Sequence, residues 1–154
     1  MSSPGACWRI DRRRRLLVAA ALGTAMPLRG GAAAPELTDA QRQRFAARAI
    51  ALRDEALRVG DQPYGALVVK DGTVVGEGVS AVVRRGDAAA HAERLAIADA
   101  LARLQSVDLA GCVLFGSSRA CAQCEAEAAR TRIAAMYYGA QATSAGEPRS
   151  RSVL

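Results

Sequence analysis

Apolar residues recur at two different spacings along the chain, and these spacings divide it into elements. Residues 35–60 have helical spacing, in which apolar positions follow one another every three or four residues. Thr38 or Asp39 can cap the first turn, and Gly60 ends the pattern. We therefore expect a long amphipathic helix here. The residues on its apolar face are Phe45, Ala49, Leu52, Ala56 and Val59.

A β-hairpin is predicted directly after this helix. Residues 66–70 and 73–77 are short runs rich in valine, and Asp71-Gly72 lies between them. An Asp-Gly pair between two such runs is typical of a two-residue hairpin turn. A loop of charged and small residues follows at 84–90.

Helices and strands alternate through the rest of the chain. Helical spacing returns at about 90–104 and 122–130, and short apolar runs at 111–116 and 133–138 indicate two more strands. A hairpin followed by alternating elements predicts an α/β fold, in which helices cover both faces of a mixed sheet.

The basic charge of the chain is concentrated at its N-terminus. The formal net charge is +6, which by itself would suggest a nucleic-acid partner. Residues 1–34 contain six arginines and one acidic residue, out of 21 basic and 15 acidic residues in all. The remainder is therefore nearly neutral, and we expect no nucleic-acid binding.

Residues 1–34 have the pattern of an export signal. The basic run 12–15 precedes an apolar stretch at 16–28, and small residues follow at 30–34. The apolar stretch is shorter than the roughly 20 residues that span a membrane, so we expect no stable membrane span. Arg13-Arg14 also resembles a twin-arginine signal. The prediction is a periplasmic or otherwise exported protein if this signal is used, and a cytoplasmic one otherwise.

Three residues have the types and positions of zinc ligands. His91 opens the helix at 90–104, and Cys121 and Cys124 open the helix at 122–130 as a Cys-x-x-Cys motif. Helix N-termini favour thiolates. One imidazole and two thiolates give a tetrahedral zinc three protein ligands and leave the fourth position open, which is typical of a catalytic site. A lone Cys-x-x-Cys could equally be a redox pair, but here it accompanies the chain's single histidine.

Glu93 is the candidate catalytic residue beside this metal. It lies two residues after His91, too close on a helix to share the orientation of that ligand. A carboxylate next to zinc can take a proton from water and pass it to a leaving amine. Zinc with such a glutamate is the apparatus for hydrolytic deamination of a heteroaromatic ring.

With these motifs, residues 40–140 resemble the cytidine deaminase-like superfamily, particularly its guanine deaminase and tRNA adenosine deaminase branch. The resemblance is carried by 63–72, which is similar to the hairpin beside the base pocket, by 87–93, and by 121–140. It implies a three-layer α/β/α fold, bound Zn²⁺ and a homodimer. On the matching positions it implies His91, Cys121 and Cys124 as ligands and Glu93 as the proton shuttle. The residues it places near the substrate are Tyr64, Ala66, Ser80 and Ala92.

The chain departs from the family pattern at several positions. Ser80 stands where an asparagine is usual, and Arg119-Ala120 replaces the Glu-Pro before the first cysteine. The deaminase domain is expected over 35–140. We expect it to be shortened at its C-terminus, without the fifth strand and C-terminal helices of relatives, and 141–154 to be a disordered polar tail.

The leading hypothesis is a zinc-dependent deaminase of a free purine base or nucleoside, with guanine favoured by the resemblance. Cytosine or cytidine deamination stays open, because the zinc motif does not choose the ring. A relative that binds zinc without turnover is the alternative outside the enzyme class.

Overall fold

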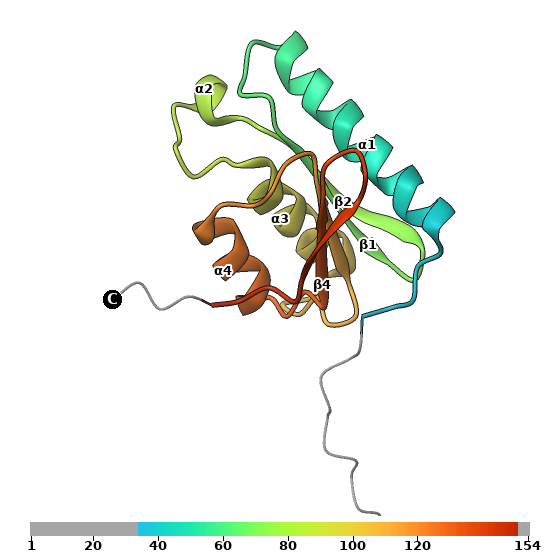
Figure 1. The fold of residues 1–154 in the computed structure, drawn as a ribbon. Coiled ribbons are helices and arrows are strands. Elements are labelled where there is room, and N and C mark those ends of the chain that lie inside the picture. Colours follow the sequence, from blue (N-terminus) through green and yellow to red (C-terminus); the bar gives the residue numbers. More distant parts are fainter. Residues whose placement is uncertain (1–33, 151–154) are drawn as a thin grey trace, which may run out of the picture.

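A five-stranded mixed sheet forms the centre of the computed structural model, which describes residues 34–150 (Figure 1). The strands lie in the order β2-β1-β3-β4-β5. β3 and β4 are parallel, and every other neighbouring pair is antiparallel. The strand bounds are β1 Gly65–Lys70, β2 Thr73–Val79, β3 Val113–Gly116, β4 Ala135–Tyr138 and β5 Thr143–Gly146.

Within residues 34–150, four helices accompany the sheet, and three of them occupy the predicted regions. They are α1 Asp39–Arg58, α2 Val82–Arg85, α3 Ala92–Leu104 and α4 Ala122–Arg130. The single turn α2 falls partly in the stretch predicted as a loop. Four residues are too few to show a helical period, so the pattern of apolar positions could not predict this helix.

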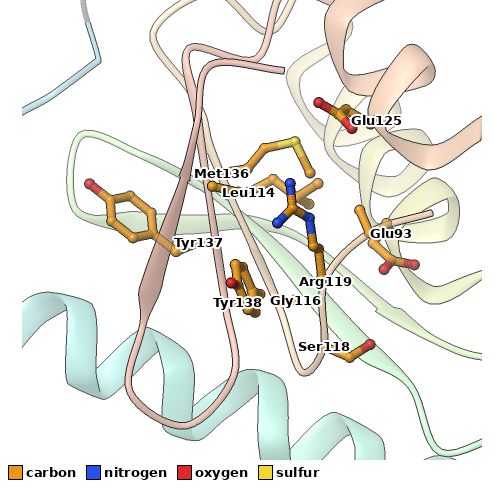
Figure 2. A pocket seen from close by; sticks show the side chains of 11 residues that line it. Glu93, Leu114, Gly116, Ser118, Arg119, Glu125, Met136, Tyr137 and Tyr138 are labelled. Atoms are coloured by element: carbon orange, nitrogen blue, oxygen red, sulfur yellow. The ribbon is translucent and has the colours of Figure 1, made fainter. Parts of the chain in front are cut away.

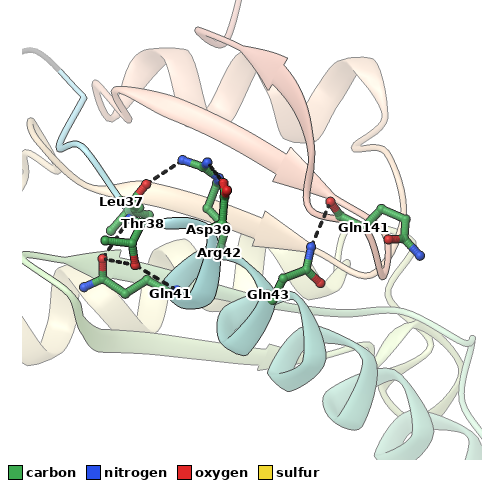
Figure 3. A network of polar contacts seen from close by, with 7 residues as sticks. All are labelled: Leu37, Thr38, Asp39, Gln41, Arg42, Gln43 and Gln141. Carbon is green, nitrogen blue, oxygen red and sulfur yellow. Dashed lines mark hydrogen bonds and ion pairs between the residues drawn. The ribbon is translucent and has the colours of Figure 1, made fainter.

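The predicted cap of α1 is confirmed at Thr38 (Figure 3). Thr38 Oγ1 accepts from the backbone N–H of Gln41 at 3.2 Å, and Gln41 Oε1 accepts from the backbone N–H of Thr38 at 2.9 Å. This reciprocal pair is a capping box, which satisfies two N–H groups that have no partner inside the helix. Gln43 donates from Nε2 to the carbonyl of Gln141 at 3.4 Å and so connects α1 to the turn before β5.

The alternation of side chains along β1 builds a core on each face of the sheet. Leu67 and Val69 pack in one apolar cluster with Phe45 and other residues of α1. Ala66 and Val68 face the opposite side and pack with α3 residues such as Ile97. Because successive strand residues point to opposite faces, one strand serves both layers. The predicted three-layer α/β/α sandwich around a mixed sheet is confirmed.

Two glycines of β2 allow α3 to lie unusually close to the sheet. A Cβ at Gly78 would lie 2.0 Å from the carbonyl oxygen of Ala92, and one at Gly76 would lie 2.4 Å from that of Ala96. Contacts this short are excluded, so only glycine fits at either position. Gly78 thereby fixes the first turn of α3 against the sheet.

The prediction that the chain has no fifth strand and that 141–154 is a disordered tail is wrong where β5 lies. Thr143 pairs with Tyr138 and Ser144 with Tyr137, antiparallel to β4. β5 is an edge strand of four largely exposed residues. It therefore has no buried apolar residues alternating with polar ones, and the sequence carries no strand pattern there.

The predicted export signal falls almost wholly outside the described residues and stays a prediction. Within 34–150, no helix is both long enough and apolar enough to cross a membrane.

Candidate metal centre and active site

The three predicted zinc ligands converge at the N-terminal ends of two helices. His91 is the N-cap residue of α3, and Cys121 is the N-cap residue of α4. Cys124 lies in the first turn of α4, where its backbone N–H donates to the Cys121 sulfur at 3.5 Å. Their ligand atoms all lie within 4.8 Å of one another. His91 thus shares one small site with two cysteines that lie 30 and 33 positions further along the chain.

The two distances between His91 and the cysteine sulfurs fit a tetrahedral zinc ion. His91 Nδ1 lies 3.6 Å from Cys121 Sγ and 3.4 Å from Cys124 Sγ. Tetrahedral bonds to zinc of about 2.3 Å from sulfur and about 2.0–2.1 Å from nitrogen place the two atoms about 3.6 Å apart. The histidine would therefore bind through Nδ1.

A bound cation would change the electrostatics of Cys124. Burial raises the pKa of the Cys124 thiol, and the negative charge of Glu93 raises that pKa further. The thiol donates to Glu93 Oε2 at 3.7 Å. A divalent cation at the three ligand atoms would reverse both influences and hold the sulfur as thiolate.

Glu93 lies in the first turn of α3, and its side chain is buried beside the ligands. The residue is only 6% exposed. Burial raises the pKa of its carboxyl, while a backbone hydrogen bond and the nearby His91 act in the opposite direction. His91 has extended backbone as the N-cap residue, whereas Glu93 has helical backbone, so the two side chains leave the chain in different directions.

An open cavity of about 500 Å³ adjoins these residues. This volume lies in the range of small-molecule sites. His91, Cys121 and Glu93 form its metal end. The residues that line the rest are Gln62, Tyr64, Ser118 and Arg119.

Of the four residues predicted to lie near the substrate, only Tyr64 lines the cavity. Tyr64 lines the cavity and is 41% exposed at its edge. Ala92 is fully buried between His91 and Glu93 in the chain, and Ala66 is fully buried in β1. Ser80 is not among the residues that line this cavity. Its hydroxyl instead donates to Oδ1 of Asp61 at 2.9 Å, inside the protein.

Gln62 and Ser118 are cavity residues that sequence reasoning missed. Gln62 lies in the loop between α1 and β1, and Ser118 follows the end of β3, three residues before Cys121. Loop residues have no period, but the short interval between the end of a strand and a metal ligand was an available signal for Ser118.

A narrow cleft continues from this cavity between the end of the sheet and α4 (Figure 2). Glu93, Ser118 and Arg119 line both spaces. The cleft adds Tyr138 and Glu125 to the polar groups near the site.

The fold and the site together define a class of protein: an α/β sandwich with one His-Cys-Cys metal site and a buried glutamate on the wall of an open cavity. Residues 39–140 match the cytidine and deoxycytidylate deaminase zinc-binding region. The chain belongs to this family, and the predicted zinc cofactor agrees with the family's description and with the three ligands.

Two characterised groups of relatives share this region. Guanine deaminase of Bacillus subtilis (strain 168) is 36% identical over 104 residues, which cover 67% of this chain and 67% of that protein. The tRNA-specific adenosine deaminase of Aquifex aeolicus (strain VF5) is 34% identical over 93 residues, which cover 59% of this chain and 62% of that protein.

Members of both groups are also among the similar solved structures. Guanine deaminase from Bacillus subtilis superposes with a TM-score of 0.62 at 35% identity, covering 64% of this chain and 63% of that one. A structure from a study of A-to-I editing by tRNA:A34 deaminases superposes with a TM-score of 0.62 at 30% identity, covering 64% and 75%. The chain thus spans less than two thirds of the solved guanine deaminase chain.

Proposed function

We propose that the chain is a zinc-dependent hydrolytic deaminase of a free purine base or nucleoside, with guanine the favoured substrate. The observation that carries this proposal is the buried carboxylate of Glu93, which lies beside the three ligand atoms and lines an open cavity. A site that held zinc only for stability would have no use for this arrangement. The similarity to guanine deaminase of Bacillus subtilis supports the choice of ring.

The chain's own residues divide the chemical work between them. His91 Nδ1 and the sulfurs of Cys121 and Cys124 would hold the ion, and a bound zinc ion supplies the Lewis acid that activates water at neutral pH. Glu93 takes a proton from the attacking water and delivers it to the leaving amine. A C–O bond forms, the C–N bond breaks, and ammonia leaves. Because Glu93 is buried, the proton passes directly between carboxylate, water and substrate.

The cavity wall supplies the groups that orient a flat polar ring. Tyr64 offers an aromatic face, and the Gln62 amide can donate and accept hydrogen bonds. The backbone of Ala92 lies between the ligand His91 and Glu93. These groups suit a heteroaromatic base, but they do not by themselves choose a purine over a pyrimidine.

The test is to purify the chain, measure its zinc, and assay ammonia release. The panel contains guanine, guanosine, adenine, adenosine, cytosine and cytidine, each with wild type and Glu93→Gln. We expect about one zinc per chain in both proteins, and release from guanine that Glu93→Gln lowers by at least 10²-fold, the contribution typical of a proton-transfer group. Zinc without ammonia from any member of this panel, and without inosine formation in a tRNA anticodon stem-loop, would favour a relative that has lost turnover.

Deamination of adenosine in tRNA is the second candidate, because the Aquifex aeolicus relative is a tRNA-specific adenosine deaminase. The nearly neutral charge of the chain after residue 34 argues against it, since RNA binding needs basic residues for the phosphates. Inosine formation in a tRNA anticodon stem-loop, with no release from free bases, would establish this alternative. The predicted homodimer and the predicted export remain part of the proposal.

A further inference from the structure

Arg119 is the one lysine or arginine among the described residues that line the cavity at the metal centre. It lies in the loop between β3 and α4, two residues before the ligand Cys121. Ala120, which follows it, packs against the apolar cluster that contains α3 and α4 residues. The backbone that carries Arg119 is therefore fixed with respect to the metal ligands.

The guanidinium of Arg119 lacks a charged partner within the described part of the chain. No ion pair of Arg119 occurs among residues 34–150. Its Cζ lies 5.9 Å from the centroid of the Tyr138 ring, close to the limit of about 6 Å for a cation–π contact. Figure 2 shows the side chain extending among the lining residues, with Tyr138 on one side and Glu93 on the other.

Glu125 is the other carboxylate of the narrow cleft, but it forms no ion pair with Arg119. Its Oε1 instead accepts from the backbone N–H of Arg149 at 3.3 Å. The positive charge of Arg119 thus stays available to a molecule in the cavity.

A neutral base in the cavity would remove water from this guanidinium without offering an opposite charge, which costs free energy. A carboxylate or phosphate would match it, because the planar guanidinium donates two parallel hydrogen bonds to two oxygens of such a group. We infer that Arg119 is a specificity-determining residue, which selects substrates that carry a phosphate or carboxylate in addition to the amino group removed. This inference rests on the deamination chemistry proposed above and changes the preferred substrate from a neutral base or nucleoside to an anionic derivative of one.

The test compares matched neutral and anionic molecules on the full chain. Guanosine is paired with guanosine monophosphate and cytidine with cytidine monophosphate for the phosphate, and cytosine is paired with 5-carboxycytosine for the carboxylate. Each pair is measured as kcat/KM by ammonia release, and as Kd by calorimetry in the Glu93→Gln background, where turnover does not interfere. The variants are Arg119→Gln, Arg119→Lys, and Arg85→Gln as a control, since Arg85 is exposed on α2 and lines neither space.

We expect the anionic member of at least one pair to be preferred by about 10- to 100-fold, the range of a hydrogen bond to a charged group. Arg119→Gln should abolish this preference, Arg119→Lys should keep part of it, and Arg85→Gln should keep all of it. The pair that shows the preference distinguishes phosphate from carboxylate. The inference would be overturned if the two members of every pair bound equally well, or if none of the molecules bound. It would also be overturned if Arg119→Gln lowered the affinity for the neutral and the anionic member equally. A binding preference without any ammonia would support it and overturn the proposed function.

Discussion

The Ser80 hydroxyl donates a 2.9 Å hydrogen bond to Oδ1 of Asp61, so the side chain that follows β2 points away from the cavity. Asp61 also accepts from the backbone N–H of Gln62 and of Arg84, both at 2.9 Å. It therefore connects the loop that carries Gln62 and Tyr64 to α2. One wall of the cavity therefore depends on a buried carboxylate that does not itself line the cavity.

Asp61 should make the stability of the protein sensitive to acid. Burial alone would raise its pKa, but the N–H groups of Arg84 and Gln62 and the Ser80 hydroxyl outweigh burial and lower the pKa from 3.8 to about 2. Because the folded pKa lies below the unfolded one, the stabilisation is complete above the unfolded pKa of about 3.9 and is lost as pH falls towards about 2. Urea unfolding from neutral pH down to about pH 2 measures this loss.

Asp61→Asn is the comparison that isolates this carboxylate. Glu77 and Asp99 also have lowered pKa values and remain in the variant, so only the difference between the two proteins reports on Asp61. We expect Asp61→Asn to be less stable at neutral pH and to lose less stability on acidification. Parallel pH profiles for the two proteins would contradict the assignment.

Ser80→Ala should lower stability and leave substrate binding almost unchanged. The variant removes a donor to Asp61 but alters no group that lines the cavity. Thermal unfolding should therefore shift downwards, because a buried carboxylate loses a hydrogen-bond donor, while KM stays almost unchanged, because no group that lines the cavity is altered. A large rise in KM at unchanged melting temperature would instead support the predicted contact between Ser80 and the substrate.

The fold was largely predictable because its buried elements carry clear periods. α1 exposes one face to solvent, and its apolar residues recur at helical spacing. β1 is buried on both faces, and its sequence is a continuous apolar run. β5 left none, since an exposed edge strand can satisfy its backbone with almost any polar sequence. A regular spacing of apolar residues indicates which face of an element is buried. An element with few buried side chains has no such spacing, and the sequence pattern does not predict it.

The metal site was predictable for a different reason. His91 and Cys121 are both N-cap residues, and zinc ligands are restricted to a few residue types with a known spacing. The direction of Ser80 was not predictable in the same way. It is set by Asp61, 19 positions earlier in the chain, and no local pattern links the two residues.

Export through the twin-arginine route predicts a specific change in location. In cell fractionation, the wild-type chain should appear in the exported fraction with its first residues removed. Arg13-Arg14→Lys-Lys should retain it inside the cell, because the twin-arginine route reads that pair. Arg84-Arg85→Lys-Lys is a matched control within the folded domain and should leave export unchanged. Unchanged export of the Arg13-Arg14 variant would exclude this route.

The two cysteines at α4 should differ sharply from Cys112 in their effect on zinc. Cys124→Ser replaces a thiolate ligand, and we expect zinc content after dialysis to fall by roughly 10-fold or more together with thermal stability, because zinc binding contributes to folding. Cys112→Ala is the control, since Cys112 is buried in the apolar cluster and is no member of the metal-binding group. It should lose some stability but keep its zinc. Equal zinc in both variants would contradict the ligand assignment.

Gly78 links the sheet to the site, and its substitution should damage both. In Gly78→Ala the new methyl group would meet the Ala92 carbonyl oxygen at 2.0 Å, so the first turn of α3 must move, and with it His91 and Glu93. We expect a loss of about 1–3 kcal/mol in unfolding free energy, the usual cost of overpacking. Gly76→Ala is the matched control, because its methyl group meets Ala96, one turn further along α3. Both variants should be destabilised, but Gly78→Ala should lose more zinc affinity and more kcat. Equal losses of zinc in the two variants would show that Gly78 serves stability alone.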